Sequence, residues 1–407
     1  MSGSATVGAM EVFVVLVAAA SIVAVISRRL VVVPYSVALV VLGVALAILR
    51  PPVEIRIEPQ LILAVLLPAL VFEGAYRTDL RLLVPSLPAV LLLAVPGVLV
   101  TAVLVGVALS VSVGLDFRLS FLVGTMVAAT DPAAILAVMA QSGATRRLTT
   151  LVEAESLFND GTGVVIFSIA VGALAVPIGP AGVAWELVVA IAASTAIGVA
   201  IGFVTSRALV GLDDHLVEVA ISLVAAYGSY LLTAQVGLSG LIATVACGLV
   251  FSGYGRRFGM SAETRQAIDI VWEFIAFLAT TLVFLLIGLA IGVSQLLAAA
   301  FASIAVLAAL LVSRGVIVYG LLGGSAWLLH RLGRVRVMPA SWLHVIAWSG
   351  LRGAVSVALA LSLPTDLPQR ALLQGIVFGT TLLTLVIQGP TARPLISGLR
   401  LRGDQQD

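Results

Sequence analysis

Residues 126–135 read Met-Val-Ala-Ala-Thr-Asp-Pro-Ala-Ala-Ile, an apolar segment with an acid and a proline near its middle. Proline removes one helical hydrogen bond and disfavours helical geometry at the residue before it, here Asp131. We therefore predict that a helix is interrupted at Thr130-Asp131-Pro132. A charge inside a segment apolar enough to cross a bilayer costs at least ~2.5 kcal/mol on insertion scales, which points to a functional role for this acid.

A second polar cluster follows about one helix later, where residues 155–160 read Glu-Ser-Leu-Phe-Asn-Asp. Ser156 and Asp160 are four residues apart, as are Glu155 and Asn159, so the four side chains form two adjacent strips on one helix face. Because the rest of the segment is apolar, this polar face is expected to point into the protein. The two clusters together predict an ion site.

The composition shows what surrounds these clusters. The 407 residues are 61% hydrophobic and 10% charged, with a mean hydropathy of +1.20. These values indicate an integral membrane protein. Long apolar runs bounded by arginines favour α-helical spans over the short alternating segments of an outer-membrane barrel. The fold class is therefore an all-α bundle in a cell membrane, crossing it many times.

With about 20 apolar residues per span, the sequence predicts thirteen transmembrane helices. Their approximate limits are 9–27, 31–49, 58–76, 84–112, 118–140, 150–176, 183–206, 215–233, 236–254, 267–292, 297–327, 340–362 and 371–392. The connections between them are short, so we expect residues 1–407 to form a single polytopic membrane domain without a soluble domain.

The basic residues predict the orientation, because cytoplasmic loops hold the excess of positive charge. All 22 basic residues are arginines. Sixteen of them follow odd-numbered spans, four follow even-numbered spans, and Arg314 and Arg352 fall inside spans 11 and 12. We therefore expect the N-terminus outside and the C-terminus inside.

A second interruption is expected in span 12, where residues 349–354 read Ser-Gly-Leu-Arg-Gly-Ala and two glycines flank a charge. Spans 5 and 12 are seven apart and so cross the membrane in opposite directions. Paired interrupted segments in two inverted halves are typical of the binding sites of secondary transporters, since freed helix ends and carbonyls can bind ions there. We thus predict two inverted repeats with crossed broken helices.

The charges inside the spans do not balance. There are four acids and two bases: Asp131, Glu155, Asp160 and Glu73 against Arg314 and Arg352. Two arginines can neutralise only two carboxylates, so at least one acid has no fixed partner. Such a carboxylate can hold either a proton or a cation. Mutually exclusive loading of one carboxylate is the chemistry of an exchanger.

These motifs resemble those of the monovalent cation/proton antiporters, in the Na⁺/H⁺ exchanger branch that includes prokaryotic relatives of the animal exchangers. The motifs in spans 5 and 6 together are highly specific, whereas those in spans 3 and 10 mean little alone. The matching segments occur in order along the chain: Phe72-Glu73-Gly74-Ala75, Thr130-Asp131-Pro132, Glu155-Ser156-Leu157-Phe158-Asn159-Asp160, Phe284-Leu285-Leu286-Ile287-Gly288-Leu289, Arg314 and Gly350-Leu351-Arg352-Gly353-Ala354.

The resemblance implies a homodimer. It also implies an ion-binding core domain, built from spans near 118–176 and 297–392, and a dimerisation domain built from the remaining spans. The transported ions would be Na⁺, with Li⁺ or K⁺ as alternatives, and H⁺. No cofactor and no nucleic-acid partner are expected.

The resemblance also assigns roles to residues. Asp160 would bind the cation and the proton in turn, while Thr130, Ser156 and Glu73 would supply further oxygens to Na⁺ or shape the cytoplasmic approach to the site. Asn159 is also expected among the ion-binding residues. It stands beside Asp160 where electrogenic relatives have a second Asp, which implies electroneutral exchange of one cation for one proton.

The other charged residues inside the spans would form two ion pairs. These pairs, together with Pro132, would support the broken helices. Arg314 is expected to pair with Glu155, and Arg352 with Asp131. Because both arginines lie near mid-span, an exchange of partners stays open.

We therefore expect a secondary-active, electroneutral Na⁺/H⁺ antiporter that works by alternating access. The alternatives are a K⁺-preferring cation/H⁺ antiporter and, from a different class, a gated cation channel. The sequence contains no glycine-rich phosphate loop, catalytic triad or metal-binding cluster of Cys or His, so we do not expect an enzyme.

Overall fold

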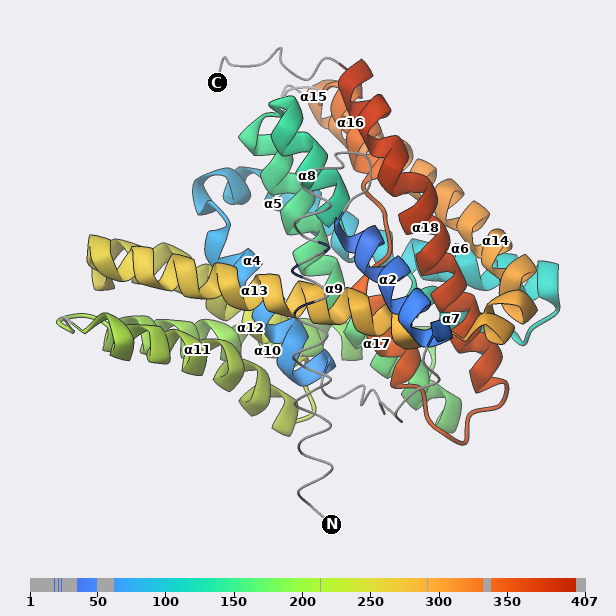
Figure 1. Cartoon of the computed structure of the whole chain (residues 1–407), viewed down its shortest axis with the longest axis horizontal. Coiled ribbons are helices and arrows are strands. Elements are labelled where there is room, and N and C mark those ends of the chain that lie inside the picture. Colours follow the sequence, from blue (N-terminus) through green and yellow to red (C-terminus); the bar gives the residue numbers. More distant parts are fainter. Residues whose placement is uncertain are drawn as a thin grey trace.

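The apolar runs form helices in the computed structural model, which describes residues 18, 21, 23, 35–49, 62–212, 214–290, 292–331 and 338–399 (Figure 1). Within these ranges the chain is helical, with no strand. The α-helices are α2 (Tyr35–Leu49), α4 (Leu67–Arg77), α5 (Leu80–Ala94), α6 (Pro96–Val113), α7 (Phe117–Met126), α8 (Ala133–Ser142), α9 (Arg146–Ala175), α10 (Pro180–Ala208), α11 (His215–Gln235), α12 (Gly240–Val250), α13 (Ala262–Ala290), α14 (Val293–Gly315), α15 (Gly324–Arg331), α16 (Ala340–Trp348), α17 (Ala354–Leu361) and α18 (Arg370–Gly398). Three π-helical segments continue neighbouring helices: η1 (Ile62–Leu66), η2 (Phe251–Gly259) and η3 (Val316–Gly323).

Each predicted span from 31–49 onward falls on one described helix or on two or three consecutive helical segments. The first predicted span, 9–27, lies outside the described residues except for three positions, so the total of thirteen and the orientation of the termini stay predictions. Of the described helical stretches, seven are long and apolar enough to cross a membrane without interruption. Two of the other predicted spans are broken into short helices, α7 with α8 and α16 with α17.

Polar residues mark where several helices begin. Asp79, Asp116 and Asp214 directly precede α5, α7 and α11, and each carboxylate accepts a hydrogen bond at 2.9 Å from a backbone N–H in the first turn. Ser239 does the same for α12 at 3.4 Å. These bonds satisfy N–H groups that have no partner inside the helix, and the residues thereby fix where the helices start.

Pro96 bends the longest stretch in the first half of the chain. Leu80–Val113 is long enough to count as one membrane span, but it consists of two helices: α5 ends at Ala94 and α6 begins at Pro96. The sequence predicts a kink at Pro96-Gly97, and the structure confirms it, because proline cannot complete the hydrogen-bond ladder of the preceding turn.

The helices pack in two groups. Helices α5–α9 pack mainly with one another and with α14–α18, whereas α2, α4 and α10–α13 form the second group. Figure 1 shows α11 on the left and α14 on the right, with α9 between them. Helices α5 and α6, which were expected among the dimerisation spans, instead pack against α7, α9 and α14.

Small residues allow the closest helix approaches in the second group. A Cβ atom placed on Gly288 of α13 would lie 2.7 Å from the Cα of Gly43 in α2. Gly202 of α10 meets the backbone of Cys247 in α12, where a Cβ would lie 2.8 Å from the carbonyl oxygen. Such contacts are typical of helices that pack inside a membrane, where small side chains let backbones approach.

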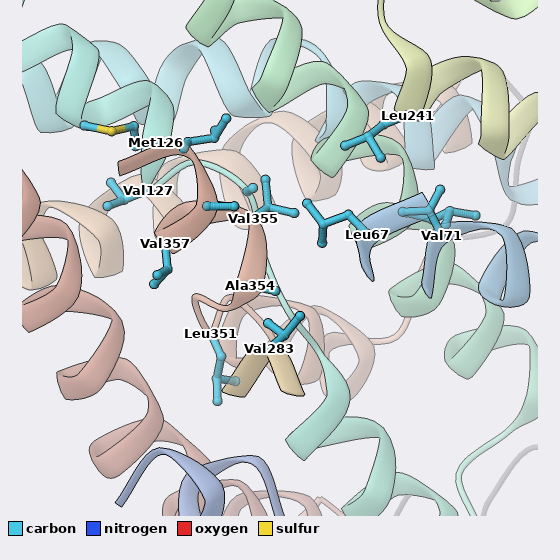
Figure 2. Packing of buried hydrophobic residues seen from close by; sticks show 14 of the residues in the cluster. Leu67, Val71, Met126, Val127, Leu241, Val283, Leu351, Ala354, Val355 and Val357 are labelled. Atoms are coloured by element: carbon cyan, nitrogen blue, oxygen red, sulfur yellow. The ribbon is translucent and has the colours of Figure 1, made fainter. Parts of the chain in front are cut away.

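Apolar side chains from both groups meet between them. Figure 2 shows Leu67 and Val71 of α4, Leu241 of α12 and Val355 of α17 in one cluster, together with Val283 of α13. All five side chains are buried. The two groups therefore share an apolar interface, and the polar site described next lies beside it.

Candidate functional site

The two broken helices meet at their interruptions. Residues 127–132 separate α7 from α8, and residues 349–353 separate α16 from α17. The backbone N–H of Asp131 donates a 2.8 Å hydrogen bond to the carbonyl of Leu351, which joins the two breaks directly. Gly353 is needed here, because a Cβ atom at this position would collide with the Asp131 carboxylate.

Helix α9 runs unbroken past the first break and holds it with side chains. The Asn159 amide accepts a hydrogen bond from the Thr130 N–H (3.2 Å) and donates one to Thr130 Oγ1 (2.6 Å). The Ser156 hydroxyl donates to the Thr130 carbonyl (2.5 Å). Two adjacent turns of α9 thus satisfy the backbone groups that the break removes from the helical ladder.

Glu155, on the same turn, forms a buried ion pair with Arg314 of α14. The two side chains are 2% and 7% exposed, and both guanidinium Nη atoms contact the carboxylate, with Nη2 at 3.2 Å from Oε2. Arg314 Nη2 also donates to the carbonyl of Ile346 and to the Ser349 hydroxyl (3.1 Å). Arg314 therefore neutralises one acid and also binds the C-terminal end of α16.

Arg352 is bound differently from the prediction. It is 1% exposed, and its Nη1 donates to the carbonyls of Ala128 (2.8 Å) and Ala129 (3.0 Å). The expected ion pair between Arg352 and Asp131, both of which the structure describes, is not formed. The reason is that α7 ends with carbonyls that have no intrahelical partner, and the guanidinium satisfies this negative helix end.

Asp131 lies at the N-terminal ends of the two helices that follow the breaks, α8 and α17. Its Oδ1 accepts a 3.0 Å hydrogen bond from the N–H of Ala133 in the first turn of α8, and its carboxylate lies against Gly353, which directly precedes α17. Helix N-termini carry partial positive charge, so this carboxylate faces favourable fields. In this arrangement arginines bind the two C-terminal ends at the breaks, and one aspartate lies at the two N-terminal ends.

A cavity of about 370 Å³ brings together most of the predicted ion-binding residues. Its wall includes Glu73, Thr130, Asp131, Ser156 and Asp160. Asn159 does not line this cavity; it faces a much smaller hollow of about 10 Å³ on the side of Arg314 and Arg352. In this structure its amide therefore positions Thr130, and its direct role in ion binding stays a prediction.

Asp160 lines this cavity without a basic partner. Among the described residues, no arginine or histidine forms an ion pair with it. The other cavity acids differ, because Asp131 caps α8, Glu73 contacts Arg77, and Glu153 is exposed. An uncompensated carboxylate in an apolar surrounding favours the uptake of a proton or a cation.

Five further polar residues line the cavity and were not predicted: Arg77, Thr78, Glu153, Thr280 and Ser356. Helical spacing could have found Arg77, four residues after Glu73, and Glu153, seven residues before Asp160. Thr280 and Ser356 come from distant helices and carry no such signal. Because Arg77 and Glu153 are exposed, the cavity opens to the surface at their end.

The chain matches the transmembrane family described as sodium/hydrogen exchanger over residues 15–398. It is 37% identical over 380 residues to the low-affinity Na(+)/H(+) antiporter NhaS1 of Synechocystis sp., covering 92% of this chain and 71% of that protein. It is 39% identical over 387 residues to the Na(+)/H(+) antiporter ApNhaP of Aphanothece halophytica, with the same two coverages.

The fold is similar to that of the sodium proton antiporter MjNhaP1 from Methanocaldococcus jannaschii. The TM-score is 0.79 at 21% identity, covering 98% of this chain and 100% of that structure. The paired broken helices, the cavity and the family match lead to one conclusion. The chain belongs to the sodium/hydrogen exchanger family of membrane transporters.

Proposed function

We propose that this protein is a Na⁺/H⁺ antiporter in which Na⁺ and H⁺ compete for the carboxylate of Asp160. The antiport activity named for its relatives supports the coarse function. The observation that carries the mechanism is the state of Asp160, since it lies in the cavity while Arg314 and Arg352 are both bound elsewhere. A carboxylate that no guanidinium neutralises must be neutralised by what it transports.

The remaining ligands are oxygens from the same wall. We assign Thr130, Ser156 and Glu73 to the Na⁺ shell with Asp160, because all four residues line the cavity and hard cations prefer oxygen ligands. Ser156 Oγ donates its proton to the Thr130 carbonyl, so its lone pairs remain available for a cation. Asn159 orients Thr130.

We further propose that the ion-binding group, α5–α9 with α14–α18, moves against α2, α4 and α10–α13 during alternating access. The packing supports this division, because contacts within each group exceed those between them. The second group is our candidate for the homodimer interface. With the arginine bias placing Arg77 on the cytoplasmic side, the described cavity opens to the cytoplasm.

The exchange is proposed to be electroneutral. One carboxylate, Asp160, is free to titrate, and its neighbour Asn159 carries no charge, so one Na⁺ replaces one H⁺. In liposomes with an imposed ΔpH, the exchange rate should not change with membrane potential. Acceleration by a potential of either sign would overturn the one-for-one stoichiometry.

The function is tested in everted vesicles that carry an imposed ΔpH, with Na⁺, Li⁺ and K⁺ added in turn. We expect Na⁺ to collapse ΔpH in the wild type and to have no effect in Asp160→Asn. A response to K⁺ alone would make the protein a K⁺-preferring exchanger. If no cation collapses ΔpH, or if Asp160→Asn exchanges like the wild type, the proposal is wrong.

A further inference from the structure

Arg77 is the basic residue among the described side chains that line the cavity; the other four charged ones are acids. Its Nε lies 2.5 Å from Glu73 Oε1, one turn earlier on α4. Its Nη2 lies 3.2 Å from Glu273 Oε2 on α13. One guanidinium thus contacts two carboxylates on two helices.

The two carboxylates differ in their surroundings. The Glu73 side chain is 19% exposed and lines the cavity, whereas the Glu273 side chain is 72% exposed and does not line it. Arg77 lies between them with its own side chain 45% exposed. The guanidinium could therefore release the inner acid while keeping the outer one, by a change in its own side-chain torsions.

We propose that Arg77 is a tethered cation that occupies Glu73 when the site is empty and must be displaced before Glu73 can bind the transported ion. Glu273 holds the displaced guanidinium at the mouth of the cavity. Arg77 thereby sets the apparent affinity for cations entering from this side and acts as a positioning residue, without touching the ion. This inference rests on the proposed function, because it assumes that Glu73 is a ligand.

The choice of arginine matters for this role. An arginine guanidinium keeps its charge across the pH range in which exchange is measured, so it competes with Na⁺ whatever the proton concentration. Because the pair is partly solvated, the competition is weak. Arg77 should therefore lower the affinity moderately and leave the maximal rate intact.

The first test measures Na⁺-dependent exchange in everted vesicles at constant ionic strength, with choline replacing Na⁺. For Arg77→Gln we expect a KM about two- to fivefold lower, the range for a partly exposed ion pair, with the maximal rate unchanged within about twofold. Arg81→Gln is the matched control, because Arg81 is exposed, lies on the same predicted side of the membrane and does not line the cavity. Its KM should equal that of the wild type.

Two further variants show whether the effect passes through Glu73. In a Glu73→Gln background, Arg77→Gln should no longer change the KM. Glu273→Gln removes the outer partner, so the Arg77 guanidinium should stay on Glu73 for more of the time. The KM should then rise about twofold. Thermal melting of each purified variant in detergent, at zero and saturating Na⁺, separates a change in ion affinity from a loss of fold.

An unchanged or higher KM in Arg77→Gln would overturn the inference, as would the same decrease in KM with and without Glu73, which would indicate a general field effect. These outcomes differ from a failure of the proposed function. In that case the wild type itself would show no Na⁺-dependent proton movement.

Discussion

Glu155 and Asp160 lie five residues apart on helix α9, in the same motif, yet they have opposite surroundings. Glu155 is 2% exposed and contacts a guanidinium through both of its oxygens. Asp160 faces a cavity, and no basic side chain among the described residues forms an ion pair with it. One helix therefore carries an ion-paired carboxylate on one strip and an unpaired carboxylate on the other.

The difference shows how a broken-helix site keeps one acid free. Arg314 neutralises Glu155, and Arg352 is bound by the carbonyls at the end of α7. Asp131 is bound in turn to the N-terminus of α8. With the helix ends and Glu155 satisfied in this way, the unpaired charge is concentrated on Asp160. We expect stability to depend on the first acid and transport on the second.

The largest effect on stability should come from the ion pair. Glu155→Ala leaves Arg314 buried without its carboxylate, so we expect the free energy of unfolding to fall by about 3–5 kcal/mol. Denaturant titration of the purified protein in mild detergent measures it. The double variant Glu155→Leu with Arg314→Met should recover most of the loss, and a single-variant loss below about 1 kcal/mol would contradict the assignment.

A smaller loss is expected where the two breaks touch. Gly353→Ala places a methyl group against the Asp131 carboxylate, so one of the two must shift at a cost of about 1–3 kcal/mol. Gly315→Ala in α14 is the matched control, because nothing lies within 4 Å of its added Cβ. If both variants unfold at the same denaturant concentration as the wild type, the contact at the breaks is not close.

Asn159→Ala tests the connection between α9 and the break. It removes two hydrogen bonds to Thr130 and leaves a buried N–H without its partner, for an expected loss of about 1–2 kcal/mol and a slower exchange. Ser168→Ala, further along the same helix, removes only a bond to the Val164 carbonyl on the exposed side of the helix and should change neither quantity. Equal effects of the two variants would argue against the positioning role.

The smallest effect on stability is expected at the transport acid. Asp160→Asn removes an unpaired charge, so the free energy of unfolding should stay constant or rise by up to about 1 kcal/mol, although exchange is lost. The same denaturant titration measures it. A loss of stability similar to that of Glu155→Ala would mean that Asp160 has a structural partner and that the contrast between the two acids is false.

Local rules predict much of this architecture. Pro132 and the glycines of residues 350–353 mark both helix breaks, and the apolar runs mark the helices. Helical spacing places Ser156 and Asp160 on one face, and both line the cavity. These features depend on neighbours in the chain, where a hydrogen bond or a torsion angle decides the outcome.

Long-range partners could not be read from the sequence in the same way. A count of acids and bases suggests an ion pair for Arg352, but this residue binds backbone carbonyls. Every residue has such a carbonyl, so residue types do not reveal this partner. The residue type of Asn159 likewise does not reveal that its amide binds Thr130. Glu273 is nearly two hundred residues from Arg77 and meets it only because α13 packs on α4.

The hydrogen bond from the Asp131 N–H to the Leu351 carbonyl connects the breaks of two helices that are far apart in the chain. Each break on its own would be a natural hinge. With this bond in place, the four half-helices should translate together as a single body, and bending should occur at the apolar interface with the second group instead. The amide proton of Asp131 should then exchange with deuterium slowly and at the same rate with Na⁺ bound or absent, although other amides around the cavity change theirs.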